Sequence, residues 1–379
     1  MIERTVKLSK SHIGSAEKNA VLEVLERGFL GMGVEVQAFE SELKNFLGTK
    51  SEVICVNTGT AALHLALEAL DLKAGDEVLV PTLTYVASFQ AITAAGAVPV
   101  PCDVYFESGL INLKDAESKV SERTRVLMPV HFASNISDLQ EVYAFAKKFS
   151  LRVVEDAAHS FGCRSQGEYV GVCSDITCFS FDGIKNITSG EGGAVVTSDL
   201  KVANAIKDSR LLGVRKDTEK RYSATRSWDF DVVGQGYRYH MSDIMAAIGR
   251  VQLRRFSHLA EKRKQLANAY SELLRHSRVM RSLINNYEDI VPHIYPVVFD
   301  SEIIRDSVRE ELSKKGIETG LHYKPNHSLT FFQGGNYQCP ESEKMYRQIL
   351  TLPLHPGISL IDVKQISDIC IGVCRDFDG

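Results

Sequence analysis

The strongest constraint on the fold is an alternation of short apolar runs with helix-patterned segments between residues 52 and 197. Helical periodicity predicts connecting helices at 61–70, 86–95 and 139–149. Apolar strands joined by helices predict an α/β fold, in which a mainly parallel sheet is covered by helices on both faces. The apolar runs predict these strands at 52–57, 77–81, 98–103, 125–131, 152–156, 176–181 and 194–197.

Helical segments flank this region on both sides. An N-terminal arm precedes helices that we expect at 15–27, where Gly28 ends the helix, and at 36–47. Residues 241–274 also have helical periodicity, and we expect one long element that is kinked or broken near Arg254.

The C-terminal third has the pattern of a smaller α+β unit. A strand is expected near 293–299, and helices are expected near 303–314 and 362–373. A chain of 379 residues has room for two domains. We therefore predict an N-terminal arm with a large domain over 1–250 and a small C-terminal domain over 251–379.

Composition excludes several classes of protein. With 44% hydrophobic residues and a net charge of −4, the chain is not intrinsically disordered and is not expected to bind nucleic acid. No apolar run reaches the roughly 18 residues of a membrane span, and the N-terminal segment lacks the apolar core of a signal peptide, so we expect a cytoplasmic protein. The eight cysteines form no C-x-x-C pair, so we expect reduced, packed thiols and neither a metal site nor a disulfide.

Ligands of open parallel sheets bind beyond the carboxyl ends of the strands, and polar residues follow several of the predicted strands. Residues 57–60 include Gly59 and Thr60, and such small residues let backbone N–H groups approach an anion at a helix N-terminus. An ordinary capped turn would have the same sequence. Because the chain lacks both a P-loop lysine and a G-x-G-x-x-G pattern here, a dinucleotide-dependent oxidoreductase is not expected.

Two further groups of polar residues lie at strand ends. Asp156 ends an apolar strand, where a carboxylate needs solvent or a cationic partner, and His159 follows three residues later. Ser180 and Lys185 follow the next strand, and Lys185 lies in a turn bounded by glycines. A desolvated lysine there can form a Schiff base with a carbonyl compound. Taken singly, each of these residues could instead be an ordinary solvated or packed side chain.

One ligand, pyridoxal phosphate, would use all of these groups. Lys185 would bind its aldehyde, Asp156 would keep its ring nitrogen protonated, and the helix N-terminus with Ser180 would hold its phosphate. Tyr85 follows another predicted strand and offers an aromatic face to the ring.

Motifs along the whole chain support this interpretation. They are NTGTAALHLAL (57–67), GDEVLVPTLTYVAS (75–88), VEDAAHSFG (154–162), FSFDGIKNITSGEGGAVVTSD (179–199), MSDIMAAIGRVQL (241–253) and LPLHPGIS (352–359). With them the chain resembles the DegT/DnrJ/StrS family of nucleotide-sugar aminotransferases, which are fold-type I pyridoxal-phosphate enzymes.

The resemblance implies a role for each of four residues around the ring. It implies that Lys185 carries the cofactor covalently and moves the proton between the substrate carbon and the cofactor carbon. Asp156 would pair with the pyridine nitrogen and Tyr85 would stack on the ring. His159 would lie near the ring and its phenolic oxygen, where many relatives have glutamine.

The resemblance also implies a phosphate site and a homodimer. Gly59, Thr60 and Ser180 would bind the phosphate, in a site built at the dimer interface. Relatives often carry an asparagine in a G-Y-N-Y-R-M segment that reaches the neighbouring subunit's phosphate. Here residues 236–241 have Arg238 at that place, which would bind either the cofactor phosphate or the nucleotide diphosphate.

The reaction implied by the resemblance is transamination from L-glutamate to a nucleotide-linked keto-sugar. A dehydratase of the same family is not expected, because that branch replaces Lys185 by histidine. Residues 319–327 resemble relatives that aminate C4 of a dTDP-4-keto-6-deoxyhexose for surface polysaccharide or O-antigen biosynthesis. Amination at C3, or a UDP- or GDP-linked substrate, is the alternative, and His322 and His327 either serve the substrate or lie in a surface turn.

A non-catalytic, cofactor-binding regulatory protein is the remaining alternative. The Arg238 change favours it, whereas the intact Lys185 and Asp156 argue against it. We assign no role to His131, His240 or Trp228, because packing would explain each of them.

Overall fold

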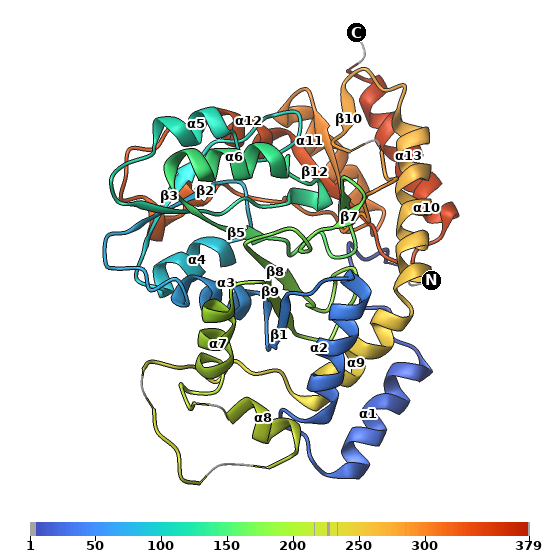
Figure 1. The fold of residues 1–379 in the computed structure, drawn as a ribbon. Coiled ribbons are helices and arrows are strands. Elements are labelled where there is room, and N and C mark those ends of the chain that lie inside the picture. The colour runs from blue at the N-terminus through green and yellow to red at the C-terminus, as the bar shows by residue number, and fades with distance from the viewer. Residues whose placement is uncertain (1–4, 216, 226–227, 233, 285, 378–379) are drawn as a thin grey trace.

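A computed structural model describes residues 5–215, 217–225, 228–232, 234–284 and 286–377, and a seven-stranded sheet lies at its centre (Figure 1). The strand order is β1-β9-β8-β5-β4-β2-β3. All seven strands predicted from the apolar runs are present, within a few residues of the expected ends. They are β1 (Glu52–Val56), β2 (Glu77–Pro81), β3 (Val98–Cys102), β4 (Thr124–Leu127), β5 (Arg152–Asp156), β8 (Ile176–Ser180) and β9 (Gly193–Thr197).

The sheet is mainly parallel, with one exception. β9 runs antiparallel to both β1 and β8. Because the segment between β8 and β9 contains no helix, it returns the chain directly beside β8 instead of crossing over the sheet. β4 is also shorter than predicted, since Pro129 has no N–H to donate to a neighbouring strand.

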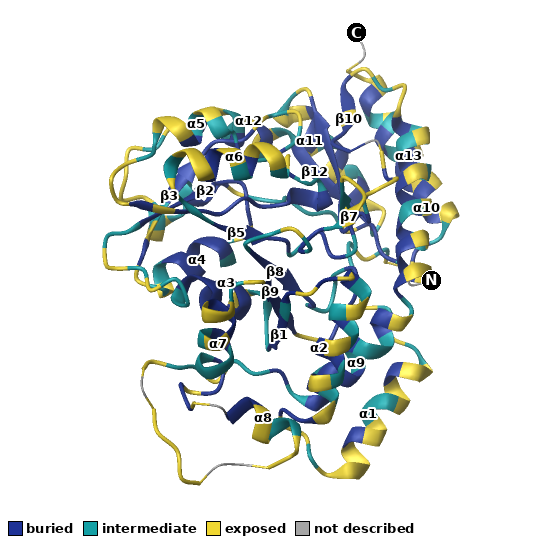
Figure 2. Ribbon diagram, viewed as in Figure 1, coloured by how far each residue is buried: buried dark blue, intermediate teal, exposed yellow. Residues whose placement is uncertain are grey.

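Helices cover both faces of the sheet, as predicted, and Figure 2 shows the strands buried between them. One face packs against α3 (Gly59–Glu68), α4 (Ala87–Ala94) and α7 (Leu200–Ser209). The other face packs against α2 (Val34–Leu47), α5 (Leu113–Ser118), α6 (Leu139–Phe149) and α9 (Asp243–Arg254). Alternate residues of each strand face the two layers: Ile54 and Val56 point to the first, and Val53 and Cys55 point to the second.

The long helical segment is broken, as the sequence predicts. α9 ends at Arg254, and α10 (Phe256–Leu274) follows after a single non-helical residue, Arg255. Ahead of the sheet, α1 (Ser15–Arg27) ends at Gly28, which has a φ of 74°. That left-handed conformation is the one in which glycine favours helix termination.

The C-terminal part contains a second, three-stranded antiparallel sheet. Its strands are β10 (Met280–Ser282), β11 (Tyr295–Phe299) and β12 (Ile349–Leu352). α10, α11 (Glu302–Lys314) and α13 (Leu360–Arg375) pack with it around one apolar core. β11, α11 and α13 match the predicted elements, whereas the short β10 and β12 and helix α12 (Pro340–Gln348) were not predicted. The domain boundary at residue 250 remains a prediction.

Smaller elements complete the fold. They are β6 (Arg164–Ser165), β7 (Glu168–Tyr169), α8 (Asp217–Tyr222) and the 3-10 turns η1 (Phe132–Ser134), η2 (Asn326–Ser328) and η3 (Thr330–Phe332). All eight cysteines are unpaired and seven are buried, while Cys173 is exposed. Within the described residues, no helix is both long and apolar enough to cross a membrane.

A buried ion pair links α2 to α7. The Arg210 guanidinium, fully buried, donates to Glu40 Oε1 at 2.6 Å and to the Cys55 carbonyl at 2.7 Å, and Tyr222 also bonds with Glu40. Replacing Arg210 by methionine should lower the free energy of unfolding by roughly 3–5 kcal/mol, because the Glu40 carboxylate would stay buried without its partner. Urea denaturation followed by circular dichroism measures this loss.

The matched control for Arg210→Met is Arg254→Met. Arg254 pairs with Glu42 at 2.8 Å but is mostly exposed, so its loss should cost at most about 1 kcal/mol. Equal losses for the two variants would contradict the assignment of stability to the buried pair.

Candidate active site

A cavity of about 450 Å³ lies beyond the carboxyl ends of the strands of the large sheet. Its wall combines the residues that follow β1, β2, β5 and β8 with a segment from the C-terminal part. Seven of the eight residues predicted for the site line it: Gly59, Thr60, Tyr85, Asp156, His159, Ser180 and Lys185.

One end of the cavity is formed by the N-terminus of α3. Thr58 caps this helix by accepting a hydrogen bond from the Ala61 N–H at 3.0 Å, so residues 57–60 do form a capped turn. They also approach β8 closely, because a Cβ atom at Gly59 would lie only 2.7 Å from the Ser180 Cβ. The helix N-terminus and the Ser180 hydroxyl therefore form a cradle that fits a phosphate.

Asp156 lies at the end of β5, buried in the cavity wall. Its Oδ2 accepts a hydrogen bond from the Ser88 hydroxyl at 2.7 Å, and its Oδ1 accepts one from the Ala158 N–H at 3.1 Å. These bonds hold the carboxylate in one orientation. A carboxylate held in this way fits the protonated nitrogen of a pyridine ring.

Lys185 lies in the loop between β8 and β9, with its Nζ 3.4 Å from His293 Nε2. Burial lowers the pKa of Lys185 to about 8, against the opposing effect of the Asp156 and Asp182 carboxylates, and the Arg263 guanidinium lowers it further. A substantial fraction of the amine is therefore neutral near physiological pH. A neutral lysine amine can attack a carbonyl carbon and can accept a proton.

His159 is held by hydrogen bonds at both ring nitrogens. The Ala133 N–H donates to Nδ1 at 3.3 Å, so in the neutral ring the proton is placed on Nε2, which lies 3.2 Å from Tyr323 Oη. Burial lowers the pKa of His159 well below its usual value, so the ring is neutral. The Tyr323 oxygen accepts this bond, and its own hydroxyl is left to donate to a ligand in the cavity.

Three residues in or beside the cavity have no firm role in the sequence interpretation. Tyr323 and His322 line the cavity from the C-terminal part, and His293 bonds with the lysine. Tyr85 is 59% exposed, and its ring lies 5.8 Å from that of Tyr323. The 319–327 motif was a signal for Tyr323, whereas nothing in the local sequence marks His293, which precedes β11.

Comparison with known proteins identifies the chain. The model of the DegT/DnrJ/EryC1/StrS aminotransferase family matches residues 11–370. The chain belongs to this family. It is therefore an aminotransferase, and its cavity is the candidate active site of a DegT/DnrJ/EryC1/StrS enzyme.

Relatives of this aminotransferase cover nearly the whole chain. An uncharacterized protein of Methanocaldococcus jannaschii, MJ1066, is 35% identical over 361 residues, which are 93% of each chain. Helicobacter pylori PseC, an aminotransferase involved in the biosynthesis of pseudoaminic acid, is 26% identical with a TM-score of 0.92, over 99% of this chain and 100% of PseC. Spr1654, a candidate sugar aminotransferase of Streptococcus pneumoniae, is 29% identical in its PMP form with a TM-score of 0.91, over 98% of each chain, and it is also known in a PLP form.

Arg238 of this family member does not line the cavity of its own subunit. It is exposed, and its carbonyl accepts a hydrogen bond from the Asn57 side-chain amide at 3.5 Å. Its role in binding the phosphate of a neighbouring subunit, which the family resemblance implies, stays a prediction.

The structure gives the positions of the histidines and of the tryptophan whose roles the sequence left open. His322 lies in the cavity wall, where its Nδ1 is 2.8 Å from Thr351 Oγ1, and not in a surface turn. His327 bonds with Thr82 Oγ1 at 2.9 Å outside the cavity. His131 is buried, as packing predicts, and His240 is half-buried. Trp228 is 85% exposed, so the prediction that packing within the chain explains it is wrong.

Proposed function

We propose that this aminotransferase moves an amino group from L-glutamate to C4 of a dTDP-linked 4-keto-6-deoxyhexose. The observation that carries the proposal is the meeting of three groups in one cavity: the Lys185 amine, the Asp156 carboxylate and the N-terminus of α3. No single one of these groups is diagnostic, but together they match the aldehyde, the ring nitrogen and the phosphate of one cofactor.

The cofactor is pyridoxal 5'-phosphate, which supplies a reactive carbonyl and a ring that withdraws electrons. The α3 N-terminus at Gly59 and Thr60 and the Ser180 hydroxyl bind its phosphate. Asp156 holds a proton on the ring nitrogen. The Lys185 amine would hold the cofactor through its carbonyl carbon, and when free it would act as the base and acid that move a proton in both halves of the reaction.

The remaining groups orient the ring and the sugar. The Tyr85 ring would flank the cofactor ring, and the Tyr323 hydroxyl, oriented by His159, would donate a hydrogen bond toward the ligand. The choice of C4 rests on residues 319–327, which resemble C4-aminating relatives and which bring His322 and Tyr323 into the cavity wall. The product would enter surface polysaccharide or O-antigen biosynthesis.

A panel of substrates tests this function. The purified enzyme, loaded with cofactor and supplied with L-glutamate, is incubated with dTDP-, UDP- and GDP-linked keto-sugars, and the products are identified by mass spectrometry and NMR. We expect the dTDP-4-keto-6-deoxyhexose to gain an amino group at C4. A product aminated at C3, or a clear preference for a UDP- or GDP-linked sugar, would replace the C4 proposal by that alternative.

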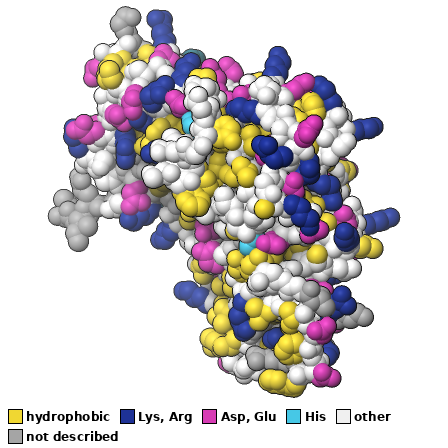
Figure 3. Space-filling model, turned by 90° about the vertical axis from the view of Figure 1, so that its left-hand side faces the viewer, with side chains coloured by type: hydrophobic (Ala, Val, Ile, Leu, Met, Phe, Trp, Pro, Cys, Tyr) yellow, Lys and Arg dark blue, Asp and Glu magenta, His cyan; other side chains and the backbone are white. Residues whose placement is uncertain are grey.

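We also propose that the enzyme is a homodimer and works in the cytoplasm. Hydrophobic side chains gather at the bottom of the molecule in Figure 3, the end at which α8 lies in Figure 1. The exposed hydrophobic residues near α8 in the sequence are Leu212, Trp228, Phe230 and Val232, and a second subunit would bury them. Eight unpaired cysteines agree with a reducing compartment.

The double variant Trp228→Ser/Phe230→Ser tests the dimer. Because buried aromatic residues carry much of the binding energy of an interface, we expect its dimer dissociation constant to rise by at least roughly 10-fold in sedimentation equilibrium. Ile303→Ser on α11, also strongly exposed, is the control and should leave the constant unchanged. A monomeric wild-type protein would refute the dimer proposal.

A further inference from the structure

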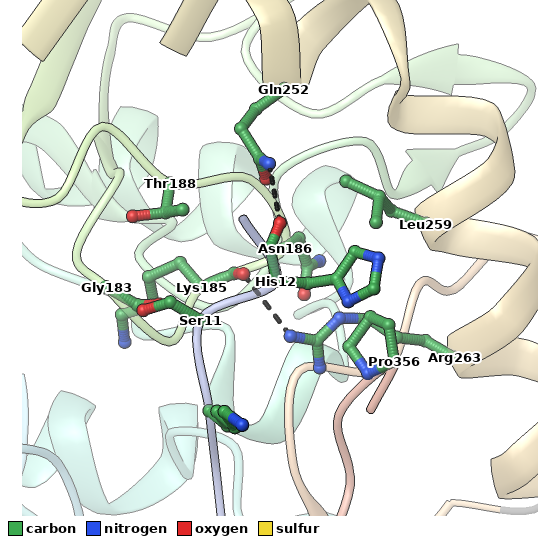
Figure 4. Close-up of a pocket in the computed structure, with 11 residues that line it drawn as sticks. Ser11, His12, Gly183, Lys185, Asn186, Thr188, Gln252, Leu259, Arg263 and Pro356 are labelled. Atoms are coloured by element: carbon green, nitrogen blue, oxygen red, sulfur yellow. Dashed lines mark hydrogen bonds between the residues drawn. The ribbon is translucent and has the colours of Figure 1, made fainter. Parts of the chain in front are cut away.

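Arg263 is a buried residue of α10 that contacts the loop carrying Lys185. Its side chain is 2% exposed, although α10 belongs to the C-terminal part of the chain and Lys185 to the large sheet. Its Nη2 donates to the carbonyls of Ile184 at 3.2 Å and Lys185 at 3.3 Å. Figure 4 shows the guanidinium reaching the Lys185 carbonyl from the side of α10.

The other terminal nitrogen of Arg263 holds two more segments. Nη1 donates to the carbonyls of Pro292 at 3.4 Å, His293 at 3.0 Å and Leu354 at 3.3 Å. One guanidinium therefore bonds with the main chain of both Lys185 and His293, whose side-chain nitrogens lie 3.4 Å apart. The four N–H groups of the two terminal nitrogens are shared among five carbonyls at fixed positions, an arrangement that suits the rigid fork of arginine better than the single ammonium of lysine.

Arg263 carries a charge that no carboxylate neutralises. Among the described residues, none of the hydrogen bonds or ion pairs of Arg263 involves Asp or Glu, and its Nε lacks a partner. Burial lowers the pKa of Arg263 to about 10, so it remains protonated at neutral pH. A buried charge without a counter-ion lowers the free energy of unfolding. A purely structural role therefore does not explain the presence of a charged residue here.

The charges around Lys185 give this guanidinium a definite effect. The Asp156 and Asp182 carboxylates favour the protonated amine, and Arg263 is the cation that opposes them. The histidines near the lysine are neutral at physiological pH, because burial lowers the pKa of each: His159, His293 and His322.

We propose that Arg263 is a positioning residue for Lys185: its guanidinium fixes the main chain of Lys185 and His293 and places a positive charge beneath the loop that carries the Lys185 amine. The proposal rests on the proposed function only in taking Lys185 as the reactive lysine. The charge of the guanidinium acts on the proton affinity of Lys185, and its shape acts on the position of Lys185. The two effects can be tested separately.

The charge is tested in cofactor-free protein with Arg263→Met. Acetic anhydride acylates neutral amines, and mass spectrometry of the Lys185 peptide at a series of pH values yields the apparent pKa of this lysine alone. Losing the guanidinium should raise that pKa by on the order of one pH unit, because the protonated amine is no longer repelled. An unchanged labelling profile in the folded variant would overturn the proposal.

The shape is tested with Arg263→Lys, which keeps the charge but cannot bond with five carbonyls. Its labelling profile should stay close to that of the wild type, whereas kcat should fall by roughly 10- to 100-fold with little change in KM for glutamate, because the amine is misplaced. A wild-type kcat would overturn the proposal, and this variant decides it even where Arg263→Met does not fold. A wild-type enzyme inactive on every sugar, with the labelling shift present, would refute the proposed function and leave the role of Arg263 standing.

Discussion

Replacing Lys185 by alanine is expected to lower the rate of transamination by at least roughly 10³-fold. The substitution removes the amine that binds the cofactor covalently and also removes the group that moves the proton, and general acid–base catalysis alone contributes about 10²–10⁴-fold. The cavity offers no close substitute, because the nearest basic group, His293, has a pKa that burial lowers well below its usual value. The rate is measured with the best substrate of the sugar panel.

The control for Lys185→Ala is Lys364→Ala. Lys364 lies on α13, where it pairs with Asp368 at 2.6 Å on the exposed surface, so its loss should leave the rate unchanged. A second measurement is the visible absorbance of the loaded protein, whose shift on addition of glutamate should disappear in Lys185→Ala only. Amino transfer at the wild-type rate in Lys185→Ala would refute the assigned mechanism.

The second large effect is expected from Asp156→Asn, which should lower kcat by roughly 10²–10³-fold. The substitution keeps the size of the side chain and an oxygen for the Ser88 hydroxyl, but it removes the negative charge that holds a proton on the ring nitrogen. A preorganised charge in a cavity sheltered from water stabilises developing charge strongly, so its loss affects kcat more than KM.

The same variant has an independent readout in cofactor-free protein. Because the Asp156 carboxylate raises the pKa of Lys185, its loss should lower that pKa below about 8, which is the opposite direction to Arg263→Met. Asp138→Asn is the control, because Asp138 caps α6 and asparagine caps helices equally well. Equal activity in the two variants would contradict the assignment of Asp156 to the ring nitrogen.

Much of the large sheet could be predicted because its signals are local. Each strand is an apolar run of a few residues, and each helix has its own periodicity, so positions such as β2 and α6 follow from short segments of sequence. The side chains at the carboxyl ends of β5 and β8 could be grouped for the same reason, since parallel strands end at one edge of a sheet. The reversed direction of β9 was not predicted, because a strand has the same apolar pattern in either direction.

The residues that complete the cavity wall come from segments distant in sequence. Tyr323 lines the cavity, and His293 bonds with Lys185, only because the second sheet and its flanking loops pack beside the first. Their local patterns, a polar turn and the residue before a strand, are the same in many folds. Arg263 lies on a helix with an ordinary amphipathic pattern, and only its position beneath the Lys185 loop distinguishes it from a surface arginine.

The sequence by itself determined the α/β class, the elements of the large sheet and the residue types for which one cofactor offers a common explanation. This was possible because short segments of sequence determine the helices, the strands and the polar residues that follow each strand. Only the tertiary structure decided which of these residues share a cavity, that Arg238 does not line it and that Trp228 is exposed to solvent. It also decided that a buried arginine, Arg263, joins the two parts of the molecule at the reactive lysine. The last of these properties depends on packing between Lys185 and Arg263, which are 78 residues apart, and no local pattern encodes such packing.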